Sequence, residues 1–267
     1  MKTVFTIIKI AAVIYFVLCL VLYFVQEKMI FFPEKIPRDY TFHFRQPFEE
    51  KSFVAADDTR LHGLLFRSDS AKGLIFYLHG NAGSLKSWGE VAKTYTDLHY
   101  DLFMLDYRGY GKSEGTISGE QQLHDDVQLV YDNLKTTYGE NKIIVLGYSI
   151  GTGPALKLAS VNHPRLLILQ APYYSLTDMM QHTFRIIPPI LLKYKFSNNI
   201  FLPNCRMPVI IFHGDKDEVI YYGSSLKLKA LFKPADTLIT LHSQGHNGMS
   251  DNQSYQQELQ RVLNRAE

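Results

Sequence analysis

Thiol groups are scarce in this 267-residue chain, which contains two cysteines. Cys19 lies inside an apolar N-terminal run and Cys205 lies in the body of the chain, so a disulfide framework and a thiolate metal site are excluded. The sequence indicates no metal and no cofactor. Two lone cysteines neither require nor forbid an oxidising compartment, so they leave open which side of a membrane the body occupies.

An excess of charge of one sign is also missing. The chain carries 28 Lys and Arg against 26 Asp and Glu, so it has no field that favours nucleic acid or a strongly anionic partner. Internal repeats and low-complexity segments are absent from the sequence. A chain of this length that is 46% hydrophobic can bury one sizeable core, and nothing demands a second domain.

Apolar residues are concentrated at the N-terminus. Residues 4–25 are apolar apart from Thr6 and Lys9, and a helix rising about 1.5 Å per residue would reach roughly the ~30 Å thickness of a hydrocarbon core. We therefore predict a single-pass membrane anchor over residues 1–27, followed by one catalytic domain over residues 28–267. Basic residues flank both ends of the run, so they leave its orientation open.

Two other interpretations of this run stay open. A cleaved secretory signal also begins with a basic residue and an apolar stretch, but this run is long and ends in bulky side chains without a small-residue cleavage pattern. A buried core helix is the third interpretation. Residues 29–33, which read MIFFP, fit either a membrane interface or packing onto the body.

Beyond residue 37, short β-rich runs alternate with helical stretches, which predicts an α/β fold with a mostly parallel sheet flanked by helices. Continuous apolar runs such as 166–170 indicate strands that are buried on both faces. Helices are expected at 119–138, at 152–160 and at 251–264, the last packing on the sheet edge. The expected strands are 51–55, 61–67, 73–79, 102–106, 142–148, 166–170, 208–213 and 237–241.

The segment 172–203 interrupts this alternation. Its prolines prevent a long helix, and its tyrosines, methionines and phenylalanine suit a short cap over a cleft. A simple surface excursion is the alternative.

The most specific local pattern is GYSIG at residues 147–151, because it follows an apolar strand directly and precedes a helix. A serine at such a turn has a strained backbone, and the flanking glycines remove Cβ atoms that would collide there. The free N–H groups of the following helix point toward developing negative charge. Ser149 is therefore the predicted nucleophile.

A serine hydroxyl needs a base that a carboxylate holds in one tautomer. Asp217 follows the strand 208–213 and His246 follows the strand 237–241, so each lies in the turn or loop after a late strand, downstream of Ser149. Asp215 and Glu218 are competitors for the acid. An oxyanion hole needs two backbone N–H donors, and we expect them from Ile150 and from Asn81, in the turn that reads HGNAG.

Two further histidines, His79 and His213, stand at strand ends, where a buried, hydrogen-bonded histidine is the more ordinary interpretation than a catalytic one. The segment 106–115, DYRGYGKSEG, has no evident role in the triad and is interpreted as a structural turn near the cleft.

These motifs together, HGNAG at 79–83, DYRGYGKSEG at 106–115, GYSIG at 147–151, HGDKDEVI at 213–220 and GHN at 245–247, resemble the α/β-hydrolase superfamily, and within it the small membrane-anchored branch of depalmitoylase-like hydrolases. The resemblance covers nearly everything after Gln26. It implies an eight-stranded sheet and ester or thioester hydrolysis without a metal, but it does not identify the substrate.

The sequence thus predicts a serine hydrolase that cleaves carboxylic ester or thioester bonds through an acyl-enzyme, with a small molecule or an acylated protein at a membrane as substrate. One rival is a serine peptidase on the same scaffold, for which the segment 172–203 is a small cap. Another rival is a noncatalytic binding or scaffold protein, which has no need of all three triad residues. Nucleic acid is not an expected partner, and the oligomeric state is open.

Overall fold

The computed structural model describes residues 1–265 and contains a central eight-stranded sheet in the order β10-β9-β8-β7-β4-β6-β3-β2. The strands from β10 to β6 pair in parallel, whereas β3 pairs antiparallel with β6 and with β2. All eight expected strands are present, with ends shifted by a few residues. Their bounds are β2 Phe48–Val54, β3 Arg60–Phe66, β4 Gly73–Leu78, β6 Tyr100–Asp106, β7 Ile143–Tyr148, β8 Leu166–Gln170, β9 Val209–Gly214 and β10 Thr237–Leu241.

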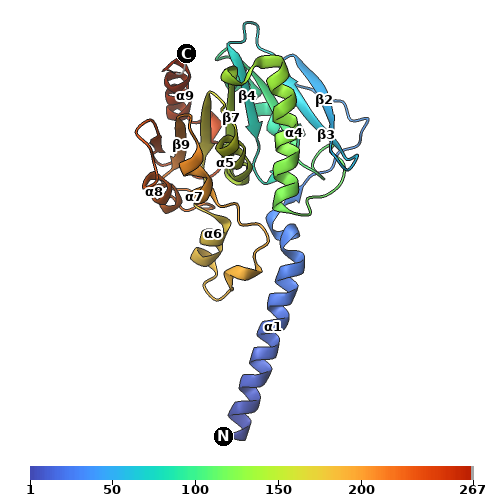
Figure 1. Cartoon of the computed structure of the whole chain (residues 1–267), viewed down its shortest axis with the longest axis vertical. Helices are drawn as coiled ribbons and strands as arrows, with labels where there is room; N and C mark the ends of the chain where they lie inside the picture. The colour runs from blue at the N-terminus through green and yellow to red at the C-terminus, as the bar shows by residue number, and fades with distance from the viewer. Residues whose placement is uncertain (266–267) are drawn as a thin grey trace.

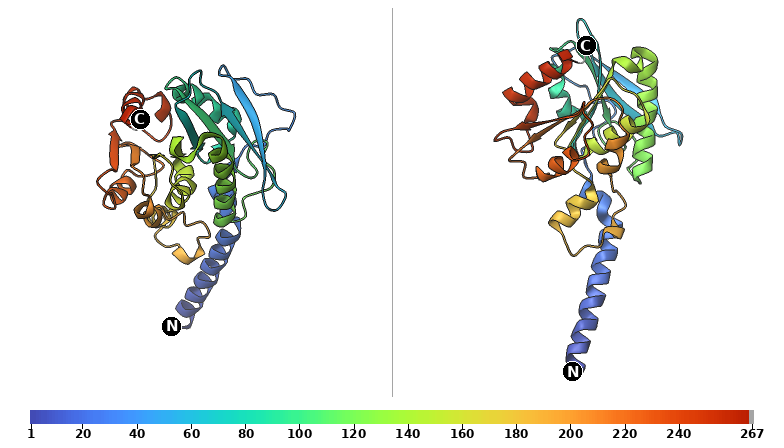
Figure 2. Two further views of the ribbon diagram at one scale, coloured as in Figure 1. Left: turned by 45° about the horizontal axis from the view of Figure 1, so that its top comes forward. Right: turned by 60° about the vertical axis from the view of Figure 1, so that its left-hand side comes forward.

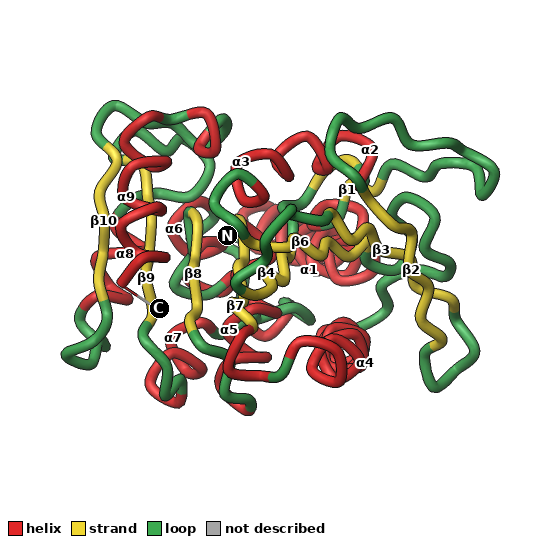
Figure 3. The backbone as a smooth tube through the Cα atoms, turned by 90° about the horizontal axis from the view of Figure 1, so that it is seen from above, coloured by secondary structure: helices red, strands yellow, loops and turns green. Residues whose placement is uncertain are grey.

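Helices cover both faces of this sheet (Figure 3). On one face lie α4 and α5, and on the other lie α2, α3 and α9. The bounds are α2 Leu85–Trp88, α3 Ala92–Thr96, α4 Glu120–Tyr138, α5 Thr152–Val161, α8 Gly223–Lys229 and α9 Gln253–Arg265. The expected helices at 119–138, 152–160 and 251–264 are therefore present.

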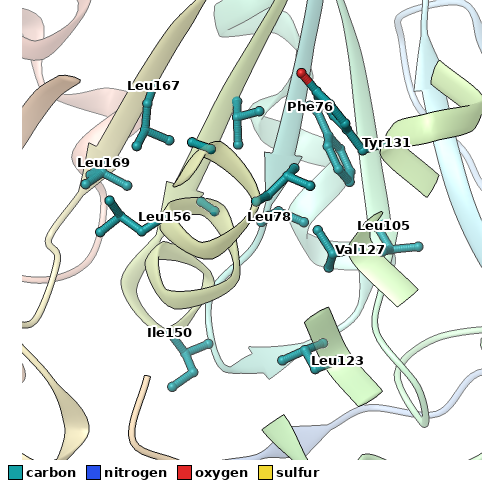
Figure 4. Close-up of a cluster of buried hydrophobic side chains, with 14 of the residues drawn as sticks. Phe76, Leu78, Leu105, Leu123, Val127, Tyr131, Ile150, Leu156, Leu167 and Leu169 are labelled. Atoms are coloured by element: carbon teal, nitrogen blue, oxygen red, sulfur yellow. The ribbon is translucent and has the colours of Figure 1, made fainter. Parts of the chain in front are cut away.

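One half of the core lies between α4, α5 and the middle strands, and the other half lies on the opposite face, with α3 and α9. Every residue of β4, β7 and β8 is buried, as expected for parallel strands covered on both faces. Each such Leu, Val or Phe contributes about 1.5–3 kcal/mol by leaving water. Figure 4 shows the packing of Leu123, Val127, Tyr131, Leu156, Phe76, Leu78, Leu105, Leu167 and Leu169.

The position of α9 corrects one expectation. The ring of Tyr255 lies 4.8 Å from that of Phe212 in β9, so α9 packs on the face of the sheet and not on its edge. The helix turns Tyr255, Leu259 and Leu263 inward, at the i, i+4, i+8 spacing of one helical face.

The N-terminal helix α1, Lys2–Ile30, projects away from the body as a single rod (Figure 1). By length and composition it can cross a membrane, and only 6% of its most apolar window is buried. This exposure contradicts the interpretation as a buried core helix. The helix extends three residues beyond the expected anchor boundary at residue 27.

The chain enters the body directly after α1. Phe31 is buried and its ring lies 5.2 Å from that of Tyr194, whereas Phe32 is exposed. The short strand β1, Phe32–Pro33, then pairs in parallel with β5, Ala82–Gly83. Of the two interpretations of residues 29–33, packing onto the body therefore applies at Phe31.

Between β8 and β9 the chain forms the segment expected as a cap. It contains α6 Leu176–Thr183, a 3₁₀ turn Pro189–Leu191, α7 Asn198–Phe201 and a second 3₁₀ turn Leu202–Asn204. In both views of Figure 2, α6 and the loop after it lie beside the C-terminal half of α1. We call residues 172–203 the cap from here on.

Candidate active site

Ser149 stands on a sharp turn between β7 and α5. Its φ is +53°, in the left-handed region that a residue with a side chain rarely adopts. A Cβ at Gly147 would lie 2.6 Å from the carbonyl oxygen of Gly151, and a Cβ at Gly151 would lie 2.1 Å from that of Leu78. Gly147 therefore lets β7 approach the start of α5 this closely, and Gly151 lets the turn approach the end of β4.

His246 faces Ser149 from the loop after β10. Its Nε2 lies 3.1 Å from Ser149 Oγ, and both side chains are largely buried. The backbone N–H of His246 donates to Glu218 Oε2 at 3.2 Å, and the Tyr148 hydroxyl donates to the carbonyl oxygen of His246. The loop is thus held on both sides of the histidine, which fixes the direction of its ring.

Asp217 lies behind the imidazole. Its Oδ2 is 2.8 Å from His246 Nδ1, and its Oδ1 accepts from the backbone N–H groups of Val219 and Ile220 at 2.9 and 2.8 Å. Burial alone would raise the pKa of this carboxyl, but hydrogen bonds from His213 and His246, together with the Ile220 N–H, hold its pKa well below its usual range. Asp217 therefore stays ionised.

The other two acids near Asp217 have different partners. Asp215 lies 3.0 Å from His242 Nδ1 and accepts from the N–H of Ser243 at 2.7 Å. Glu218 contacts only the backbone of His246 and not its ring. Of the three candidates, Asp217 is the one whose carboxylate meets the His246 imidazole.

The two other histidines are buried at strand ends. His79 Nδ1 lies 2.7 Å from the carbonyl oxygen of Gly80, and burial lowers its pKa. His213 Nε2 lies 3.2 Å from Asp217 Oδ2, and its Nδ1 lies 2.6 Å from Ser225 Oγ. No pattern in the residues indicates that His213 contacts the acid, because that contact depends on the shape of the turn 214–220.

Asn81 and Ile150, the residues expected to supply the oxyanion donors, both line the cavity beside Ser149. The Asn81 turn is held from two directions. The Tyr110 hydroxyl donates to its carbonyl oxygen at 2.6 Å, and its side-chain oxygen accepts from the N–H of Phe32 at 3.3 Å. The turn thus depends on the strand that follows α1.

Residues 106–115 also hold the Asn81 turn and the residues beside it in place. The Tyr107 hydroxyl donates to the carbonyl oxygen of His79 at 2.9 Å, and Asp106 accepts from the N–H of Leu85 at 3.0 Å. A Cβ at Gly111, whose φ is +49°, would lie 1.9 Å from Asp106 Oδ2. The interpretation as a structural turn near the cleft agrees with these contacts.

The cavity in front of Ser149 has a volume of about 400 Å³, within the range of small-molecule sites. Its floor includes Ser149, His246 and Asn81, and its walls carry apolar side chains from the end of α1 and from the cap, among them Met29 and Met179. Ser149, His246 and the two prospective oxyanion donors thus line one partly apolar hollow.

Comparison with solved structures addresses the fold. An esterase from Pyrococcus furiosus superposes with a TM-score of 0.67 at 18% identity, covering 89% of this chain and 96% of the esterase. A family described as serine aminopeptidase S33 hydrolases matches residues 69–202, half of the chain. The chain is an α/β-hydrolase. The fold predicted from the sequence motifs is confirmed.

Curated relatives of this α/β-hydrolase include the lysophosphatidylserine lipase ABHD12 of Macaca fascicularis, 30% identical over 187 residues, which are 62% of this chain and 47% of the lipase. The α/β-hydrolase domain-containing protein 17B of Xenopus laevis is 33% identical over 200 residues, 72% of this chain and 66% of the relative. The matched region of this α/β-hydrolase therefore spans about half to two thirds of these relatives' lengths.

Proposed function

We propose that this α/β-hydrolase is a membrane-anchored serine hydrolase that cleaves carboxylic ester or thioester bonds through an acyl-enzyme. The observation that carries the proposal is the chain of contacts from Ser149 Oγ to His246 Nε2, at 3.1 Å, and from His246 Nδ1 to Asp217 Oδ2, at 2.8 Å, at the floor of one cavity. Names of relatives that include a lipase and an esterase support an ester-type bond.

Acylation begins when Ser149 Oγ attacks the carbonyl carbon and its proton passes to His246 Nε2. The N–H groups of Ile150 and Asn81 donate to the oxyanion of the tetrahedral intermediate. The intermediate collapses, the bond to the leaving alkoxide or thiolate breaks, and His246 Nε2–H protonates that leaving group. Water then attacks the acyl carbonyl carbon and passes a proton to His246. The second tetrahedral intermediate collapses, the bond from the acyl carbon to Ser149 Oγ breaks, His246 returns the proton to Oγ, and the carboxylic acid is released.

Asp217 stays ionised through this cycle. Its carboxylate accepts from His246 Nδ1–H, so the imidazole presents an unprotonated Nε2 to Ser149 and its positive charge is stabilised when it takes the proton. Asp217 itself has no need to exchange a proton, because its depressed pKa keeps the carboxyl charged.

A serine peptidase is the second candidate, favoured by the description of the matching family. An aminopeptidase needs a carboxylate to bind the substrate's terminal ammonium group. Among the described residues, the lining of the cavity beside Ser149 contains no Asp or Glu side chain. The cavity thus favours an acyl group with an apolar chain over a charged peptide N-terminus.

The test compares the full chain in detergent with Ser149→Ala. We expect fluorophosphonate labelling to vanish and hydrolysis of p-nitrophenyl butyrate to fall on the order of 10⁴-fold or more. Ser160→Ala, on the helix α5 that follows Ser149, is the matched control and is expected to keep full activity, because among the described residues its hydroxyl bonds to the carbonyl oxygen of Lys157. Aminoacyl p-nitroanilides are expected to be poor substrates.

Three results would oppose the proposal. Unchanged hydrolysis in Ser149→Ala removes Ser149 as nucleophile. Faster cleavage of aminoacyl anilides than of esters favours the peptidase. A folded wild type that neither labels nor hydrolyses favours a noncatalytic binding or scaffold protein.

A further inference from the structure

A second hollow adjoins the catalytic cavity, between the C-terminal end of α1 and the cap. Its volume is about 510 Å³. It shares four lining residues with the catalytic cavity: Met29, Ile30, Leu176 and Met179. The two hollows therefore adjoin each other at these four side chains, and the second extends from the catalytic cavity along α1. We call the second hollow the α1–cap groove.

The α1–cap groove is lined almost wholly by apolar side chains. Its far end is formed by Leu22 on α1 and by Thr183, Phe184 and Ile187 of the cap. Within residues 1–265, no charged side chain contributes to this lining. Such a surface favours an apolar ligand, because a polar one would lose its hydrogen bonds to water without replacing them.

Gln26 and Thr183 are the polar lining residues, and the amide of Gln26 is already occupied. Its Nε2 donates to the carbonyl oxygens of Tyr23 and Leu191, at 2.9 and 3.1 Å, and its Oε1 accepts from the N–H of Lys193 at 2.8 Å. The side chain is only 6% exposed. Gln26 therefore links the two walls of the groove, and its own amide has no unpaired group left to offer a ligand.

The cap reaches far down α1. The Tyr15 hydroxyl donates to the carbonyl oxygen of Ile186 at 2.5 Å, and Tyr15 lies roughly 16 Å before Gln26 along a helix of 1.5 Å rise. Around this contact the cap exposes Phe184, Ile186 and Ile190, which are 54%, 78% and 86% exposed. Figure 1 shows the loop after α6 beside α1.

The contact between Tyr15 and the cap indicates where the α1–cap groove would lie in a bilayer. When residues 4–25 of α1 cross the hydrocarbon core, a cap that touches Tyr15 lies at the depth of the lipid tails, where its exposed apolar side chains are stable. The far end of the α1–cap groove then opens toward acyl chains and not toward water.

We propose that the α1–cap groove binds the long acyl chain of an ester or thioester that enters sideways from the bilayer, with its carbonyl carbon reaching Ser149. The inference rests on the proposed hydrolase function and names the substrate class: long-chain acyl esters or thioesters already resident in a membrane. The anchor helix is thus one wall of the substrate site.

The first test is a chain-length series. We use the full chain in phosphatidylcholine vesicles with p-nitrophenyl esters from acetate to palmitate. We expect kcat/KM to rise by up to roughly fourfold per methylene group while the chain fills the groove, and then to level off. S-palmitoyl peptide and palmitoyl glycerol in the same vesicles distinguish a protein from a lipid source of the chain.

The matched pair of variants is Thr183→Trp and Ile190→Trp. Thr183 lines the far end of the groove, whereas Ile190 lies on the same cap, is 86% exposed and is outside the lining. We expect Thr183→Trp to lower kcat/KM for palmitate at least tenfold and to leave acetate within twofold. Ile190→Trp is expected to leave both within twofold.

A second readout does not depend on catalysis. A palmitoyl ester carrying a diazirine is photo-crosslinked to Ser149→Ala in the same vesicles, and we expect crosslinks on residues 22–30 and 176–192. Crosslinks elsewhere, or a kcat/KM that does not change from acetate to palmitate, would overturn the groove proposal while leaving the hydrolase intact. If the wild type neither labels nor hydrolyses, but the crosslinks still fall in the groove, the proposed activity alone would be overturned.

Discussion

The surroundings of Ser149 and the wall formed by α1 and the cap are built in opposite ways. Around Ser149, β7 is fully buried, two glycines are fixed by backbone contacts, and the carboxylate of Asp217 has four polar partners. In the wall, α6 has no buried residue, and α1 is almost wholly exposed apart from the buried side chains of Cys19 and Gln26.

This difference assigns two tasks to two regions. Bond cleavage needs atoms held within fractions of an ångström, and the proposed triad lies in tight turns and loops at the ends of strands. Choice among acyl chains needs only an apolar surface of suitable length, which methionines and a few hydrogen bonds can supply. We therefore expect changes near Ser149 to have larger effects than changes in the cap.

The largest effect is expected for Asp217→Asn. The amide cannot hold His246 in the required tautomer, so kcat should fall on the order of 10⁴-fold while the protein stays folded. Asp215→Asn is the control and should stay within a few-fold of wild type. Steady-state kinetics with p-nitrophenyl butyrate measure both, and equal losses in the two variants would contradict the assignment of the acid.

Gly151→Ala comes next. The added Cβ would lie 2.1 Å from the Leu78 carbonyl oxygen, so the backbone must move, and we expect a loss of about 4 kcal/mol in the free energy of unfolding or failure to fold. Gly119→Ala is the control, because a Cβ there meets nothing within 4 Å. Urea unfolding of both variants in detergent provides the measurement.

Acidity should reduce the contribution of Asp217 to stability. A carboxyl whose pKa is lowered in the folded state stabilises above its unfolded pKa of about 3.9 and loses this contribution as the pH falls. The free energies of unfolding of wild type and Asp217→Asn should differ by about 2 kcal/mol at pH 7, and the difference should shrink below pH 4. If the difference between the two free energies of unfolding grew as the pH fell, the pKa of Asp217 would be raised in the folded state and not lowered.

Tyr110→Phe tests the support of the Asn81 turn. Removing the hydroxyl leaves the Asn81 carbonyl oxygen without this donor, and we expect a roughly tenfold fall in kcat with KM nearly unchanged, less than the 10²–10³-fold loss of an oxyanion donor itself. Tyr131→Phe, whose hydroxyl contacts Glu140 far from Ser149, is the control. A change in KM alone would point to a role in binding.

The smallest effect is expected for Gln26→Leu in the cap wall. The carbonyl oxygen of Leu191 and the N–H of Lys193 lose their partner, at a local cost of about 1 kcal/mol. Hydrogen exchange in residues 189–195 should accelerate about fivefold, while exchange in β7 stays unchanged. Acceleration in β7 would mean that the two regions are coupled more tightly than their packing indicates.

The catalytic strands and turns are predictable because each carries a local signal. An apolar run, a glycine-flanked serine and turns after strands are enough to locate Ser149, Asp217 and His246 along the chain. The pairing of β1 with β5 is not predictable, because two-residue strands have no periodicity and join segments about 50 residues apart. Gln26 looks like the polar end of an apolar run, and only tertiary contacts give it a partner in the cap.

The direct passage from α1 into β1 fixes the distance between the end of the helix and the domain that contains Ser149. Because the helix ends at Ile30 and the paired strand begins at Phe32, there is no tether on which the catalytic body can swing away from a bilayer. In the membrane-anchored enzyme that we propose, this short link keeps Ser149 at one distance from the bilayer. We therefore expect this enzyme to favour carbonyl groups held at that distance from the membrane over carbonyl groups held farther from it.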